Sequence, residues 1–441
     1  MDLSTTAFAV NTPKFWGGEK ELVADCIETG WISSEGPAVK EFESKMASRC
    51  SRRHAIACAN GTAALDIAVK ALNLSEGDEV RTAPNQRQSL EETRHYTMSY
   101  DVQEKRLVTH ERESTCEHNI WEKEGRCDSS KLLHHLSDHP GDEHEGQKTT
   151  EETNTQTNTS EDATFNMDVS QLASKITPKT KAIICVHTYH FPVDMEPVLA
   201  LAKEHGIKVI EDAAEMIGQT CLGRPCGSFG EISTMSFYPN KHITTGEGGM
   251  VLCDDPELAE RCQQLRNLCF DPKKRRFVHE DLGWNYRMTN LQAALGLGQL
   301  LHLDEAVQRK REIGRLYSKL LKGCPGLILP PDDLRSETNI YWVYGVELLP
   351  SVPCEADEVM KHLAAAKVGT RPFFWPMHEQ PVFLQMGLFK GQSFPVAERI
   401  ARRGFYIPSG GETSHTRRAG CILGHCTAWL GCLDRRDHGA T

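Results

Sequence analysis

Short apolar runs alternate with helical periodicity in two parts of the chain, before residue 80 and after residue 180. An apolar run at 54–59 turns at 60–62 into a helical pattern over 63–72. The alternation recurs around a second helical pattern at 197–205, with apolar runs at 182–187, 207–212, 232–237 and 249–253. Strands that alternate with helices are typical of α/β proteins. The pattern therefore predicts an α/β fold.

The remaining periodic segments suggest how the chain divides into domains. Helices are predicted at 19–29, 38–48, 257–268, 289–322 and 356–366, and a strand at 340–348. With 441 residues, the chain is long enough for one large and one smaller domain. We place a large domain at 1–295, a small one at 296–408, and an atypical tail rich in Gly, Arg and Cys at 409–441.

One internal segment, 81–161, breaks the pattern. It is polar, holds almost no apolar periodicity, and ends in a low-complexity run at 149–162 (TTEETNTQTNTSED). Such a segment buries too little apolar surface to offset an ordering entropy of about 1–2 kcal/mol per residue. We predict that it is disordered. The histidines and cysteines within it have spacings that match no common zinc pattern, so no metal site is predicted there; they are Cys116, His118, Cys127, His134, His135, His139 and His144.

Composition narrows the class of protein. The formal net charge of −11 argues against a nucleic-acid partner. Neither a signal peptide nor an apolar run long enough for a membrane span is found. The 16 cysteines form no CxxC pair, which is typical of buried thiols in a reduced compartment. These features predict a cytoplasmic protein that does not bind membranes.

Residues 236–249 hold the most informative chemistry. Lys241 lies there in a tight loop between an apolar run and the glycines at 246, 248 and 249. Burial disfavours the ammonium form of a lysine, so we expect the pKa of Lys241 to be lowered and its amine to be nucleophilic. Such an amine forms a Schiff base with a carbonyl compound, above all pyridoxal 5′-phosphate.

Three further features point toward the same lysine. Gly61 and Thr62 follow a strand and start a helix, where free backbone amides and the helix dipole favour a phosphate. Asp212 ends a buried strand, and its carboxylate suits a protonated pyridine nitrogen. Ser236, five residues before Lys241, offers a hydroxyl to the same phosphate. Taken singly, Gly61-Thr62 also reads as an ordinary turn and Asp212 as a helix N-cap.

The order of these motifs resembles the DegT/StrS-type sugar aminotransferases, PLP-dependent transferases of fold type I. The matching segments are 30–37 (GWISSEGP), 60–65 (NGTAAL), 209–215 (VIEDAAE), 236–250 (SFYPNKHITTGEGGM), 283–294 (GWNYRMTNLQAA), 341–346 (YWVYGV) and 369–381 (GTRPFFWPMHEQP). The resemblance implies a large mixed-sheet domain and a small α+β C-terminal domain. Within the family the chain is most similar to the GDP-perosamine synthase group, which moves an amino group from L-glutamate to the 4-keto carbon of a GDP-linked 6-deoxy sugar.

The resemblance also implies roles for residues around the cofactor. Lys241 would be the Schiff-base lysine and the acid/base that moves the proton, and Asp212 would hold the pyridinium nitrogen. Glu215 falls where the family places a side chain near the cofactor's 3-hydroxyl. Thr62 and Ser236, with the turn at Gly61, would bind the phosphate.

Three more positions carry implied roles further from the ring. Asn285 matches an asparagine that reaches the cofactor phosphate of the neighbouring subunit, which implies a homodimer with shared active sites. Arg371 and His378 lie in a loop that the family turns toward the sugar nucleotide.

Residues 81–161 replace the family region that carries the aromatic residue stacked on the pyridine ring. An inactive family member is therefore an alternative interpretation of this chain. A PLP-dependent sugar dehydratase is a second alternative. Those enzymes have histidine in place of the lysine, so Lys241 argues against it and the neighbouring His242 keeps it open.

Overall fold

A computed structural model describes residues 10–75, 77–83, 164–271, 273–275, 277–279, 281–410 and Gly424. The atypical tail from 411, apart from Gly424, lies outside the described residues. The same holds for the polar segment from 84 and for its histidines and cysteines. Arg81 is nevertheless buried at the end of a strand, because its guanidinium pairs with Glu79 and donates to the Thr180 hydroxyl. The predicted start of disorder at 81 is therefore wrong by at least three residues.

A six-stranded mixed sheet forms the large domain, with the strand order β1-β8-β7-β4-β3-β2. Its strands are β1 (His54–Cys58), β2 (Glu79–Arg81), β3 (Thr180–Val186), β4 (Lys208–Asp212), β7 (Ile232–Ser236) and β8 (Gly249–Cys253). Strands β2, β3, β4 and β7 are parallel, whereas β8 runs antiparallel to both β7 and β1. The predicted α/β alternation is confirmed, and the carboxyl ends of β1, β3, β4 and β7 share one edge.

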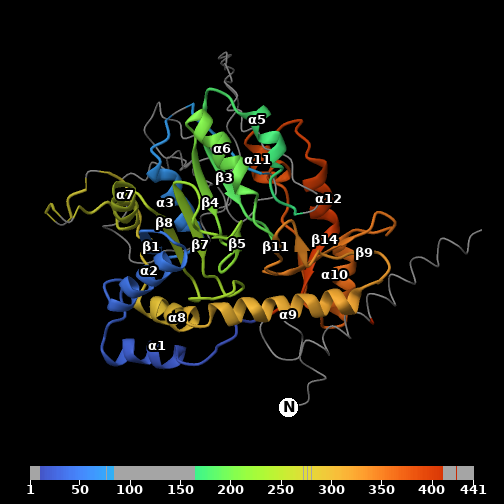
Figure 1. Ribbon diagram of the computed structural model, residues 1–441, viewed down its shortest axis with the longest axis horizontal. Helices are drawn as coiled ribbons and strands as arrows, with labels where there is room; N and C mark the ends of the chain where they lie inside the picture. Colours follow the sequence, from blue (N-terminus) through green and yellow to red (C-terminus); the bar gives the residue numbers. More distant parts are fainter. Residues whose placement is uncertain are drawn as a thin grey trace, which may run out of the picture.

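Helices cover both faces of the sheet (Figure 1). On one face, α3 (Gly61–Ala71) and α7 (Pro256–Arg266) pack on Ile210, Ile232 and Val251. The other face packs against α2 (Pro37–Arg49), α6 (Met195–His205) and α8 (Asn290–Leu300). Because side chains alternate along a strand, β4 directs Ile210 and Asp212 toward α3 and Glu211 away from it. In the described part of the chain, the remaining helices before α8 are α1 (Glu19–Glu28), η2 (Val169–Gln171) and α5 (Leu172–Lys175).

The predicted single helix at 289–322 is two helices, α8 and α9 (Leu303–Leu321), separated by a turn at Leu301 and His302. They run one after the other beneath the sheet and then the small domain (Figure 1). The predicted strand at 340–348 is shorter than expected, because Tyr341 adopts a left-handed conformation with φ 51° and β12 begins at Tyr344.

A four-stranded sheet with the order β13-β14-β12-β9 builds the small domain. Its strands are β9 (Leu327–Ile328), β12 (Tyr344–Leu348), β13 (Arg371–Pro372) and β14 (Gly404–Ile407), and its helices are α10 (Ala356–Ala365), η3 (Met377–Glu379), α11 (Pro381–Gln385) and α12 (Pro395–Arg403). Two-residue hairpins pair β5 (Thr220–Cys221) with β6 (Arg224–Pro225), and β10 (Asp333–Leu334) with β11 (Glu337–Thr338). Within the described ranges, no helix has the length and apolar character needed to cross a bilayer.

Candidate active site

Residues from three separate segments meet at the shared carboxyl edge of the large sheet. Asp212 ends β4, Ser236 ends β7, and Gly61 begins α3 directly after β1. A Cβ atom built on Gly61 would lie 2.8 Å from the Ser236 Cβ, so the helix start and the strand end are in contact. In open α/β sheets ligands bind at this edge. The first turn of α3 contains the partly buried Thr62 and therefore faces this edge. Its free backbone amides are suited to binding a phosphate there.

Lys241 is buried in the loop that follows β7, as the sequence predicts. Its backbone amide donates to the Tyr238 carbonyl at 2.9 Å, which makes a tight turn. The Thr245 amide returns to the Phe237 carbonyl at 3.0 Å and closes the loop. The side chain is thereby directed inward, toward Glu215.

Two buried carboxyl groups, Glu215 and Asp212, lie near the buried Lys241 amine. Lys241 Nζ is 3.9 Å from Glu215 Oε1, and the Tyr189 amide donates to Glu215 Oε2 at 2.7 Å. Burial raises the pKa of Glu215 to about 8 and also raises the pKa of Asp212, while the charge of Lys241 opposes both shifts. Burial thus outweighs the charge of Lys241 at both acids, and a protonated pyridine nitrogen beside Asp212 would supply further positive charge. The residues present fit pyridoxal phosphate.

The alternative interpretation of Asp212 as a helix N-cap is wrong. Its carboxylate Oδ1 accepts the Ala214 amide at 3.0 Å, but the following residues form turns, and the next helix of the described chain is α7. One side of the Asp212 carboxylate is fixed by this bond. The Thr234 side chain makes a further hydrogen bond to this carboxyl group.

Three of the predicted residues lie outside this buried cluster. Asn285 is exposed on the loop before α8. Arg371 is exposed in β13 and lines a cleft of about 570 Å³ together with Asn240 and Lys367. His378 is buried elsewhere, because its Nε2 pairs with Glu398 Oε1 at 2.9 Å and its ring packs edge-on against Phe394. The expectation that His378 turns toward a substrate has no support in this geometry.

Two aromatic residues that the sequence interpretation did not assign to the site are central to it. The Trp342 ring lies under Lys241 Nζ, with 4.1 Å between the nitrogen and the ring centroid. The Tyr189 hydroxyl accepts the Phe374 amide at 2.8 Å, so this residue joins Glu215 to the loop that follows Arg371. Trp342 is about a hundred residues from Lys241 in sequence, and no local pattern links the two.

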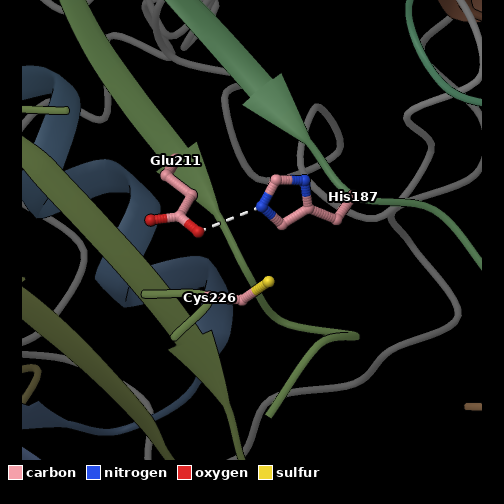
Figure 2. A group of neighbouring side chains, drawn as sticks. All are labelled: His187, Glu211 and Cys226. Carbon is pink, nitrogen blue, oxygen red and sulfur yellow. Dashed lines mark hydrogen bonds and ion pairs between the residues drawn. The ribbon is translucent and has the colours of Figure 1, made fainter. Parts of the chain in front are cut away.

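A second buried cluster lies on the opposite face of β4 from Asp212, where His187, Glu211 and Cys226 approach one another (Figure 2). The Val193 amide donates to His187 Nδ1 at 3.0 Å, which leaves Nε2 to donate to Glu211 Oε1 at 3.0 Å. Glu211 also accepts the amides of residues 227 and 229 and the hydroxyl of residue 233. These donors occupy both carboxylate oxygens, so the cluster is a hydrogen-bonded structural junction and offers poor metal ligands.

The DegT/DnrJ/EryC1/StrS aminotransferase family matches residues 17–88 and 158–418 of this sequence. The chain belongs to this family. The GDP-perosamine synthase of Escherichia coli O157:H7 is 35% identical over 400 residues, which cover 91% of this chain and 92% of the relative. The GDP-perosamine synthase of Caulobacter vibrioides is 33% identical over 401 residues, with the same shares covered.

Solved structures agree with the family assignment. DesV of S. venezuelae superposes with a TM-score of 0.72 at 25% identity, covering 93% of this chain and 94% of that chain. DesI, solved in the presence of its TDP-sugar product, gives a TM-score of 0.75 at 24% identity, covering 98% of this chain and 96% of that chain. The prediction of a PLP-dependent transferase of fold type I is confirmed. Pyridoxal 5′-phosphate is the cofactor of this family, and that prediction is confirmed too.

Proposed function

We propose that this chain transfers an amino group from L-glutamate to the 4-keto carbon of a nucleotide-linked 6-deoxy sugar, in the manner of a GDP-perosamine synthase. The observation that carries the proposal is the buried Lys241 amine, 3.9 Å from Glu215 and at the sheet edge where Asp212 ends its strand. The 30–35% identity to three GDP-perosamine synthases supports the choice of substrate.

Each buried residue has a part in this proposal. Bound pyridoxal phosphate supplies an aldehyde that takes up amines and a ring that withdraws electrons from the adjacent carbon. Lys241 Nζ would hold the cofactor through that aldehyde and, when not so bound, would take up and release the proton. Asp212 would keep the ring nitrogen protonated, and Glu215 would orient the 3-hydroxyl. The hydroxyls of Thr62 and Ser236, with the amides at Gly61, would bind the phosphate.

The cleft beside Asn240 is the proposed entrance for the nucleotide sugar. Arg371 and Lys367 line it and supply two positive charges, which suit a diphosphate. The cleft reaches Asn240, the residue directly before Lys241. A sugar on the diphosphate would therefore extend toward the Lys241 amine. His378, held by Glu398, has no place in this arrangement.

The proposed active form is a homodimer in which Asn285 serves the partner's site. Two residues of the segment that carries Asn285 are largely exposed although apolar, Phe277 at 74% and Leu282 at 75%. Phe277 also lines a cleft of about 1000 Å³ with Ser33 and Arg287. Exposed apolar surface of this kind marks interaction sites, and a second copy of the chain would cover it.

Incubation of the purified protein with GDP-4-keto-6-deoxymannose, L-glutamate and PLP tests the proposal, with the amino sugar detected by mass spectrometry. We expect product from the wild type and none from Lys241→Ala. Transfer only to a dTDP- or UDP-linked ketone would replace the nucleotide and leave the chemistry in place. Failure to bind PLP at Lys241, tested by borohydride reduction and peptide mapping, would favour the inactive family member.

A further inference from the structure

The indole of Trp342 is packed directly against the reactive nitrogen of the site. Trp342 is fully buried in the turn before β12, and its ring centroid lies 4.1 Å from Lys241 Nζ. A cation within about 6 Å of an aromatic face is attracted by the negative charge of that face, and tryptophan is the strongest of the aromatic residues in this respect. In a site closed to water the attraction is least screened.

Contacts on three sides fix the orientation of this ring. Trp342 Nε1 donates to the Asn240 carbonyl at 3.0 Å, so the indole is tied to the residue directly before Lys241. The backbone carbonyl of Trp342 accepts a hydrogen bond from the buried Lys310 Nζ at 3.0 Å. The Tyr189 ring stacks on the indole with centroids 6.1 Å apart and planes 25° apart. The ring therefore cannot turn away from Lys241 without losing its hydrogen bond to Asn240 and its stacking on Tyr189.

The charged groups around Lys241 balance only part of its ammonium charge, so the Trp342 ring can stabilise the rest. Glu215 faces the amine, but burial raises its pKa to about 8, so near neutral pH it carries little of the counter-charge that an ammonium needs. Asp212 is the other acid near the amine, and in the proposed function it pairs with the nitrogen of the cofactor's pyridine ring. His242 stays neutral because burial lowers its pKa to about 3. Lys310, behind Trp342, has a pKa lowered to about 7 by burial and adds no counter-charge.

We infer that Trp342 is a catalytic residue whose ring face stabilises the protonated Lys241 amine whenever that amine is not bonded to the cofactor. This inference rests on the proposed function of Lys241. The amine is free during part of each turnover and must then take up and release a proton. Together with Glu215 at 3.9 Å, the ring offsets part of the hydration that the buried ammonium has lost.

The test measures the apparent pKa of the Lys241 amine in the absence of catalytic turnover. The apoprotein is mixed with PLP over a range of pH, the adduct is reduced with borohydride, and the initial labelling rate at Lys241 is quantified by peptide mass spectrometry. A tetrafluorinated tryptophan placed at 342 by site-directed incorporation keeps the shape of the ring and removes the negative charge of its face. Trp342→Leu removes the ring altogether.

We expect the apparent pKa of Lys241 to fall by about half a unit to one and a half units with the fluorinated ring, and by at least as much in Trp342→Leu. The matched control is the same fluorinated residue at Trp375, whose ring carries Arg402 at 4.8 Å. That variant should label like the wild type. An unchanged pH profile in a folded protein fluorinated at 342 would overturn the inference. If the wild type is not labelled at Lys241, the proposed function fails and the inference with it.

Discussion

Gly61→Ala should weaken cofactor binding, because the first residue of α3 has no room for a methyl group. The added Cβ would lie 2.8 Å from the Ser236 Cβ and 3.1 Å from its Oγ. Carbon atoms pack at about 3.5–4.0 Å, so a rotation of the hydroxyl relieves the second contact but not the first. The end of β7 must shift away from the helix. Overpacking of this kind costs about 1–3 kcal/mol.

The effect should appear mainly in the affinity for PLP. If the shift displaces the phosphate-binding hydroxyl, the same free energy raises the dissociation constant about 5- to 150-fold. Alanine favours a helix more than glycine does, which offsets part of the strain in the folding free energy of the apoprotein. PLP titration followed by absorbance measures the dissociation constant of PLP. Thermal unfolding without PLP measures the stability of the apoprotein.

Ser236→Gly provides the matched background, since it removes the atom against which the new methyl group would press. In that background, Gly61→Ala should change the PLP affinity little, and the double-mutant cycle should show clear coupling. Wild-type affinity in the single variant would refute the reasoning. So would an equal loss of affinity in both backgrounds, because the contact with Ser236 would then be irrelevant.

Two further predictions concern buried acids. Burial raises the pKa of Asp66 to about 7, so the folded state holds a proton that the unfolded chain releases near pH 4. The contribution of Asp66 to stability should therefore fall as pH rises from 4 to 7. Asp66→Asn should lack this component and gain at most about 4 kcal/mol over the wild type at pH 8 in urea unfolding; parallel pH profiles of the two proteins would contradict this. Glu211→Gln turns an amide toward the donors at residues 229 and 233 and should cost about 1–3 kcal/mol, while Zn²⁺ should leave the wild-type melting temperature unchanged. Zinc-dependent stabilisation that is lost in Glu211→Gln would show that the junction is a metal site.

Local patterns were sufficient for five of the six strands of the large sheet, all but β2, and for the order of the chemistry along them. The apolar runs of β3, β4, β7 and β8 are visible in the sequence because every second or every residue in them is buried. Asp212 and Ser236 are predictable at strand ends, since strands end where apolar runs end. The burial of Lys241 follows from its place between such a run and a glycine cluster. The roles of these side chains toward the cofactor stay predictions.

The sequence by itself determined the α/β alternation, the lysine loop and the approach of Gly61 to the sheet edge, because each depends on residues adjacent in the chain. Only the tertiary structure decided that Trp342 lies under Lys241, that Tyr189 holds Glu215, and that His378 pairs with Glu398. The physical reason is that these contacts join segments distant in the chain, which are brought together by packing within each domain or, for Trp342 and Lys241, between the two domains. Packing of that kind depends on the shapes of whole surfaces and leaves no periodic signal in the chain.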